Sequence, residues 1–93
     1  MKVKNLLPIG SVVLLHNLDR RVMIYGRFQT EKETGKEFDY AGCFYPQGVE
    51  DTSKVLLFNQ EDIKTLFFVG FQDIEEFMYR EEIAKYFENQ ENS

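Results

Sequence analysis

The sequence has 93 residues, of which 43% are hydrophobic, and a formal net charge of −5. This length fits one small domain, and no apolar stretch reaches the roughly 20 residues that a membrane-spanning helix needs. The single cysteine excludes an intramolecular disulfide and a cysteine-based zinc site. The first residues hold no apolar segment long enough for a secretion signal. We therefore expect one cytoplasmic domain over residues 1–93, without membrane insertion.

The negative charge lies in the C-terminal segment. Residues 1–72 hold nine basic and nine acidic side chains, whereas residues 73–93 hold seven acidic and two basic ones. An acidic surface repels phosphate groups, so we expect no binding to nucleic acid. Arg20, Arg21 and Arg27 could form a local basic spot, but acidic residues nearby balance them.

Strand signals fill the chain from residue 6 to residue 70. An extended lead-in precedes an apolar strand over 11–16, and turn-forming residues 17–19 connect it to a strand over 20–29. Because this connection is short, the two strands should form an antiparallel hairpin. Alternation along the second strand places Val22, Ile24, Gly26 and Phe28 on one face, and Met23, Tyr25 and Arg27 on the other.

The most distinctive stretch is residues 37–48. Side chains alternate there, with Phe38, Tyr40, Gly42 and Phe44 on one face and Asp39, Ala41, Cys43 and Tyr45 on the other. Small residues between large ones predict an inner strand with close packing on both sides. We expect Asp39 to pair with Arg27 across the hairpin.

Further strands are predicted after the hydrophilic loop 47–53. A short strand covers 55–58, Asn59 caps a single turn at 60–64, and a fifth strand covers 65–69.

A helix should follow over about residues 74–88. Asp73 and Glu76 have the spacing of a capping box with Asp as the cap. The apolar stripe of this helix is interrupted by Arg80 and Glu81, and the tail 89–93 should fray. The predicted fold is α+β: a small twisted antiparallel sheet or half-barrel of about five strands with one C-terminal helix.

The side chains that could take part in catalysis or metal binding are better explained by structural roles. His16 ends a strand beside a turn, and Cys43 has apolar and aromatic neighbours, which favours a buried, inert thiol. The acidic pairs 61–62 and 75–76 suit helix starts better than metal binding, because adjacent helical residues do not face each other. Phosphate-binding and nucleophile motifs are missing from the sequence. We therefore predict a non-enzymatic protein without a catalytic, cofactor or metal site.

The chain carries more aromatic residues than one small core obviously needs. They are Tyr25, Tyr40, Phe44, Tyr45, Phe67, Phe68 and Phe71. Either the helix covers them, or an exposed cluster marks a surface that binds a protein partner. The candidate partner surface consists of Tyr25, Arg27, Asp39, Tyr40, Tyr45 and Phe71.

Five stretches, in this order, suggest a relationship: residues 7–15, 23–27, 39–48, 58–63 and 70–71. Over roughly residues 6–78 the chain resembles a small domain-of-unknown-function family of Gram-positive bacteria, similar to proteins encoded beside type VII secretion genes and their exported LXG toxins. The pattern Tyr-x-Gly-Cys-x-Tyr-Pro-x-Gly at 40–48 is its most specific part. Family members often have histidine where this chain has Gln60, which weakens any metal or proton-transfer role there.

The resemblance implies an accessory protein of toxin export, namely an adaptor, chaperone or targeting factor that binds a toxin or a secretion component. Two alternatives stay open. One is an immunity protein that blocks a toxin with its acidic helix, and the other is a half-barrel that binds a small ligand with Arg27, Asp39 and Tyr40. A sheet this small could also form a homodimer through an edge strand.

Overall fold

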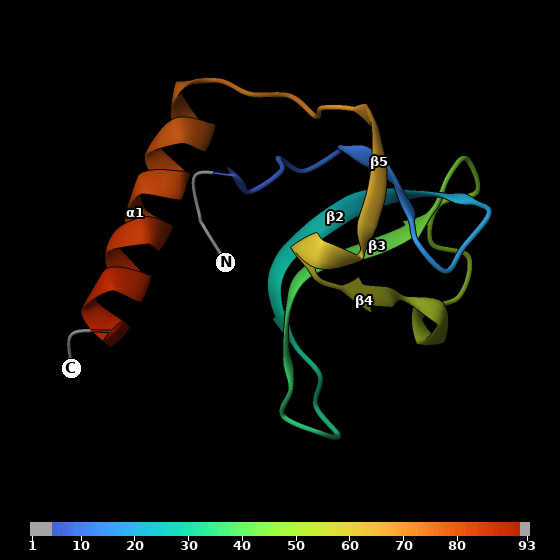
Figure 1. Cartoon of the computed structure of the whole chain (residues 1–93), viewed down its shortest axis with the longest axis horizontal. Helices are drawn as coiled ribbons and strands as arrows, with labels where there is room; N and C mark the ends of the chain where they lie inside the picture. Colours follow the sequence, from blue (N-terminus) through green and yellow to red (C-terminus); the bar gives the residue numbers. More distant parts are fainter. Residues whose placement is uncertain (1–4, 92–93) are drawn as a thin grey trace.

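The computed structural model describes residues 5–91 and shows a five-stranded antiparallel sheet followed by one helix (Figure 1). The strands are β1 (Val12–Leu15), β2 (Arg21–Thr30), β3 (Glu37–Phe44), β4 (Leu56–Phe58) and β5 (Ile63–Phe68), and the helix is α1 (Ile74–Glu91). Two short 3₁₀ turns, Thr52–Lys54 and Gln60–Asp62, flank β4. The α+β class and the five predicted strands are confirmed.

The sheet is strongly curved. Its strand order is β4-β3-β2-β1-β5, so β4 and β5 form the two edges. Only residues 59–62 connect these edges in the sequence. Because four residues span little distance, the sheet must bend to bring β4 near the start of β5, as Figure 1 shows.

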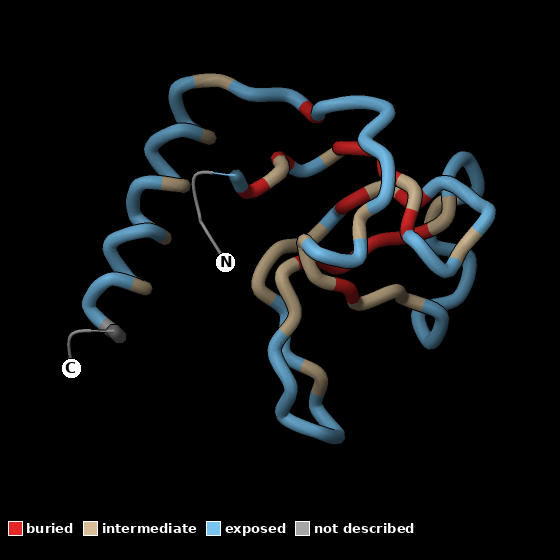
Figure 2. Tube along the Cα trace, in the orientation of Figure 1, coloured by how far each residue is buried: buried red, intermediate tan, exposed pale blue. Residues whose placement is uncertain are grey.

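One face of the sheet, here called the inner face, holds the core. Directly paired residues of neighbouring strands share a face, and the pairs Val13–Val22 and Tyr40–Phe58 place four fully or almost fully buried side chains together. Figure 2 shows the buried positions concentrated in these strands. Gly42 is required there, because a Cβ atom would lie 2.6 Å from Val22 Cγ1 and 2.9 Å from the Met23 carbonyl oxygen. The predicted close packing around this strand is confirmed.

A bulge in β2 changes which residues share a face. Ile24 pairs with Gly42, but Gly26 pairs with Ala41 and Arg27 with Tyr40, so one extra residue is inserted at Tyr25. Arg27 therefore lies on the inner face beside Tyr40, and its predicted position on the face of Met23 was wrong. The expected pair between Arg27 and Asp39 was also wrong, because the Arg27 guanidinium binds Glu76 of α1.

The chain crosses its own N-terminal lead-in between β5 and α1. The Gly70 N–H donates to Ser11 Oγ at 2.9 Å, and this buried hydroxyl donates to the Pro8 carbonyl oxygen at 2.8 Å. A Cβ atom on Gly70 would lie 2.1 Å from the Ile9 carbonyl oxygen. Only glycine fits this crossing, which directs the linker 69–73 away from the sheet toward α1.

Helix α1 lies at one end of the molecule and leaves much of the sheet uncovered (Figure 1). Asp73 caps it, since its carboxylate accepts the Glu76 N–H at 3.1 Å, but the Glu76 side chain pairs with Arg27 instead of completing the predicted capping box. The helix runs to Glu91, three residues beyond the predicted end. Of the predicted frayed tail, residues 89–91 are helical, and residues 92–93 lie outside the described part of the chain.

One stripe of α1 faces the sheet, and it explains the interrupted apolar pattern. From Ile74 to residue 89, the half-buried positions are Glu76, Arg80, Ile83 and Phe87, spaced three or four residues apart. Figure 2 shows these half-buried positions on the side of the helix toward the sheet. Arg80, which interrupts the apolar pattern, thus belongs to the inward stripe, where it pairs with Glu76 at 2.8 Å.

Candidate interaction surface

The structure divides the six residues of the predicted partner surface into two groups. Tyr25, Tyr45 and Phe71 are exposed. Tyr40 is fully buried, the Arg27 side chain is only 6% exposed, and Asp39 is half-buried. The six residues therefore do not form one continuous surface.

Tyr40 and Asp39 connect three segments of the fold. The Tyr40 hydroxyl accepts the Leu7 N–H at 3.0 Å and donates to the Gln60 side-chain oxygen. The Asp39 carboxylate accepts the Gln60 N–H at 2.9 Å, and the Asp39 N–H donates to Asn59 Oδ1 at 3.0 Å. Burial raises the pKa of Tyr40, so its hydroxyl stays protonated and can donate. These residues hold the β4–β5 turn and the N-terminal lead-in against β3.

Arg27 attaches α1 to the sheet. Its two terminal nitrogens donate to the two carboxylate oxygens of Glu76 at 2.6 and 2.9 Å, and its guanidinium lies 5.1 Å from the centre of the Tyr79 ring. Glu76 is 11% exposed and also accepts the Arg80 Nε–H. Burial alone raises the pKa of Glu76, but the hydrogen bonds and charges of Arg27 and Arg80 outweigh it, so the pKa is lowered. The carboxylate is ionised at neutral pH and joins both arginines.

The opposite, outer face of the sheet carries an exposed aromatic group around Arg21. We call Arg21, Tyr45, Phe67 and Phe68 the sheet patch. The Arg21 guanidinium lies 5.2 Å from the Tyr45 ring centre and 5.8 Å from that of Phe67, within the range of cation–π contacts. Phe67 is 53% and Phe68 61% exposed. Within residues 5–91 no carboxylate forms an ion pair with Arg21.

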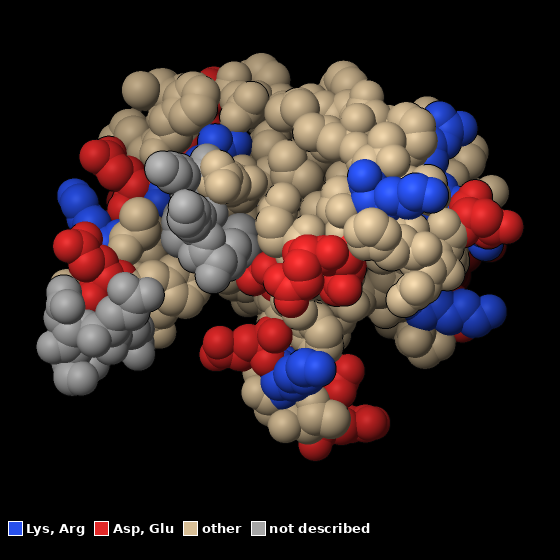
Figure 3. Space-filling model, viewed as in Figure 1, with Lys and Arg blue, Asp and Glu red and all other residues tan. Residues whose placement is uncertain are grey.

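A second exposed apolar group lies where the linker enters α1. We call Phe71, Ile74, Phe77 and Met78 the helix patch; Phe71 is 78% exposed, and the other three are more than half exposed. The last three lie outside the inward stripe, and positions 74, 77 and 78 are neighbours on a helix surface. Three exposed carboxylates accompany them, those of Glu75, Glu81 and Glu82. Figure 3 shows a broad uncharged area across the upper part of the molecule, with Lys and Arg both at the sheet end and beside α1.

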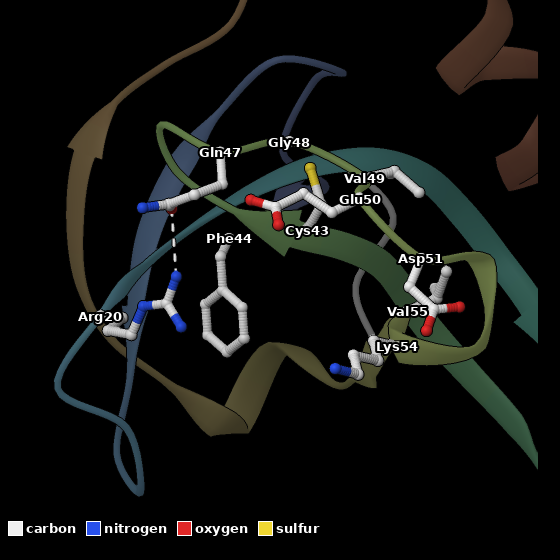
Figure 4. A pocket seen from close by; sticks show the side chains of 10 residues that line it. All are labelled: Arg20, Cys43, Phe44, Gln47, Gly48, Val49, Glu50, Asp51, Lys54 and Val55. Carbon is white, nitrogen blue, oxygen red and sulfur yellow. Dashed lines mark hydrogen bonds between the residues drawn. The ribbon is translucent and has the colours of Figure 1, made fainter.

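A hollow of about 280 Å³ lies beneath the loop after β3 (Figure 4). Arg20 stacks 3.9 Å above the centre of the Phe44 ring and donates to the Gln47 side-chain oxygen at 3.1 Å. Cys43 also lines the hollow, and burial raises the pKa of its thiol, which keeps it protonated and poorly nucleophilic. The hollow is not lined by Arg27, Asp39 or Tyr40, the residues of the predicted ligand site.

Two searches of the described residues give negative results. Nowhere in residues 5–91 do three or more His, Cys, Asp or Glu side chains group in a way that could hold a metal ion. Across the same residues, α1 included, no helix is both long enough and apolar enough to cross a bilayer.

The sequence identified some of the exposed aromatics but not their arrangement. Of the seven surplus aromatics, Tyr40 is buried and Phe44 half-buried. The exposed aromatics of α1 were missed; they are Phe77, Tyr79 and Tyr86. Phe67 and Phe68 were among the surplus aromatics, and Arg21 was assigned only to a basic spot with Arg20 and Arg27. The structure separates these arginines: Arg20 covers Phe44, Arg21 lies between two exposed rings, and Arg27 binds α1. The sequence did hold a signal for the helix patch. Helical spacing puts Ile74, Phe77 and Met78 on a different side of α1 from Ile83 and Phe87, so the helix cannot bury both groups against one sheet.

Comparison with known proteins gives a match to a family model. No match was found among curated proteins or among solved structures. The family model described as "Domain of unknown function (DUF4176)" matches residues 6–79, which include all five strands, the crossing at Gly70 and the first turn of α1. The chain therefore belongs to the DUF4176 family of domains of unknown function.

Proposed function

We propose that this protein is a non-enzymatic accessory module that binds a protein partner through the outer face of its sheet. The observation that carries the proposal is the sheet patch, in which Arg21 lies between the exposed rings of Tyr45 and Phe67. Tyrosine and arginine are enriched among the residues that contribute most to protein–protein binding. Large aromatic side chains supply the apolar area for such contacts.

The geometry favours a protein partner over a small ligand. The sheet patch is an exposed surface, whereas small ligands bind in concave sites that enclose most of their area. Arg27 and Tyr40, which a small ligand would need in the alternative hypothesis, are buried and already hydrogen-bonded to other parts of the chain. Among residues 5–91 no carboxylate pairs with Arg21, so its guanidinium can donate hydrogen bonds to a carboxylate of a partner.

The partner class comes from the resemblance to proteins encoded beside type VII secretion genes. On this basis the partner is an exported toxin or a component of the secretion machinery, and the protein acts as an adaptor, chaperone or targeting factor in the cytoplasm. This step rests on gene association, so it requires a direct test.

The test is affinity purification of the tagged chain from its own cytoplasm, followed by mass spectrometry. Wild type is compared with Tyr45→Ala and Phe67→Ala, and Lys32→Ala in the exposed β2–β3 loop is the control. We expect a toxin or secretion component with wild type and the control, and its loss with both patch variants. Recovery of the same proteins with all four chains, or of the tagged chain alone, would contradict the proposal. Circular dichroism establishes that each variant is folded.

A second candidate is an immunity protein, which the exposed acidic side of α1 favours. Glu75, Glu81 and Glu82 are exposed and could cover a basic toxin site. Replacing these three by Gln should abolish rescue of toxin-expressing cells if the acidic side acts in this way. Glu76 must be left unchanged, because it attaches the helix to Arg27. Failure of wild type to rescue such cells excludes this candidate and leaves the adaptor proposal standing.

A further inference from the structure

Two exposed apolar surfaces with different charged neighbours lie on the same chain. The sheet patch contains Arg21. The helix patch is accompanied by the exposed acids Glu75, Glu81 and Glu82 and by one exposed base, Lys85, so the helix side is acidic on balance. We propose that the helix patch of one molecule docks on the sheet patch of a second copy, and that the second copy returns the same contact, so that two chains form a two-fold dimer. This pairing goes beyond the proposed function and needs no other protein. It occupies the same sheet patch, so a protein partner would bind in competition with the second copy.

Charge complementarity selects this pairing over the alternatives. Glu81 lies four residues after Phe77 and three after Met78, so its carboxylate is on the same side of α1 as the helix patch. A helix patch on a sheet patch brings this carboxylate to Arg21. Two helix patches would bring together surfaces with more carboxylates than lysines, since Lys85 offsets only one of the three acids. Two sheet patches would bring guanidinium groups together. Such like-charge contacts oppose association.

A second molecule is needed because the helix patch cannot turn onto its own sheet. Glu76 and Arg27 form a two-pronged pair, and Ile83 packs against the core from the same stripe. With this stripe held inward, Ile74, Phe77 and Met78 remain on other sides of the helix and more than half exposed. Covering them therefore requires another chain.

The exposed area suffices for a stable dimer. The seven apolar side chains of the two patches, from Tyr45 to Met78, are between 42% and 78% exposed. At about 200 Å² for each fully exposed large side chain, they present roughly 800 Å² per chain. This is close to the area that each partner buries in a standard protein–protein interface. A two-fold arrangement uses both patches of both chains and leaves neither unpaired.

Sedimentation equilibrium of the full chain tests the proposal. The monomer mass is 11.0 kDa, and we expect a concentration-dependent rise toward twice that mass. Arg21→Glu and Glu81→Arg should each raise the dissociation constant at least about tenfold, because each places like charges at both contacts of the dimer. An equimolar mixture of the two variants should dimerise again, since each contact then joins opposite charges. Lys32→Glu, in the β2–β3 loop, should behave as wild type.

Three results would overturn the proposal. One is a wild type that stays monomeric up to roughly 200 μM, a concentration above the micromolar-to-picomolar dissociation constants of interfaces of this size. Another is a dimer that persists in both single variants, which would place the interface elsewhere, for example at the edge of β5. The third is a mixture that stays monomeric although both variants are folded by circular dichroism. A monomeric wild type would leave the proposed partner binding unaffected, because that is tested by loss of a toxin or secretion component.

Discussion

The sheet and the helix are held in place by different interactions. The sheet buries Val13, Val22 and Ile24 completely, and apolar burial contributes about 25 cal/mol per Å². The stripe that attaches α1 contains the charged residues Glu76 and Arg80 beside Ile83 and Phe87. An ion pair removed from water gives a smaller net stabilisation than apolar packing of similar size. We therefore expect α1 to detach at a lower free energy than the sheet unfolds.

Gly42→Ala should give the largest effect, by breaking the sheet. The added Cβ would lie 2.6 Å from Val22 Cγ1 and 2.9 Å from the Met23 carbonyl oxygen, which cannot move without disturbing the β2–β3 pairing. We expect a loss of about 4 kcal/mol in the free energy of unfolding, or failure to fold. Urea unfolding followed by circular dichroism measures it.

Gly35→Ala is the matched control for this prediction. Gly35 has a φ of +71° and no atom within 4 Å of the added Cβ. Its replacement should cost only the conformational strain, about 1 kcal/mol. If both variants lost the same free energy of unfolding, the packing around Gly42 would be looser than the structure shows.

Glu76→Gln should weaken the helix attachment without unfolding the sheet. It leaves the Arg27 guanidinium, 6% exposed, without its carboxylate, which should cost about 3 kcal/mol of helix docking. Amide exchange in α1 should accelerate while exchange in β1–β3 stays slow. The exposed neighbouring change Glu75→Gln should leave both rates unaltered. Acceleration in the sheet as well would mean that the two parts unfold together.

Acid should act on the same contact. Because the pKa of Glu76 is lowered in the folded state, from an unfolded value of about 4.3, its stabilising contribution is complete above about pH 5. That contribution is lost as the pH falls through the folded-state pKa. Chemical shifts of α1 amides should report detachment of the helix in this range in wild type. In Glu76→Gln this acid step should be missing, and its persistence would assign the step to other carboxylates.

Tyr40→Phe should lower the free energy of unfolding by less than Gly42→Ala does. The lost contacts join the sheet to the N-terminal lead-in. The change removes the hydroxyl that serves the Leu7 N–H and the Gln60 side chain but keeps the ring against Phe58. Leaving these groups unpaired should cost about 2 kcal/mol in urea unfolding. Tyr25→Phe, at an exposed ring, is the control and should change stability by less than about 0.5 kcal/mol. Equal effects would mean that water replaces the Tyr40 hydroxyl without loss.

The sequence was most informative where a local pattern decides the structure. Alternation predicted the strands, the small residue at Gly42 predicted close packing, and Asp73 predicted the start of α1. Local patterns could not show the bulge at Tyr25, because a bulge is defined by how β2 pairs with β3. The sequence of β2 alone does not tell which of its residues lacks a partner. They also could not pair Arg27 with Glu76, which lies 49 residues away.

The candidate surface was harder to predict than the fold for a related reason. Alternation put Tyr40 and Tyr45 on opposite faces of one strand segment, but it could not tell which face the rest of the chain covers, so both were placed in one surface. Only the path of the chain after Gly70 decides that α1 lies beside the sheet instead of over Phe67 and Phe68. Arg21 is a candidate binding residue only because it lies beside the exposed rings of Phe67, from β5, and Tyr45, from the end of β3.

Native-state hydrogen exchange measured by NMR tests the contrast between the sheet and the helix most directly. The structure predicts that amides of α1 exchange through a local opening with a lower free energy than amides of β1, β2 and β3, and that Glu76→Gln lowers only the value for α1. A single free energy shared by helix and sheet, reduced equally by Glu76→Gln, would contradict the account and make α1 part of one cooperative core.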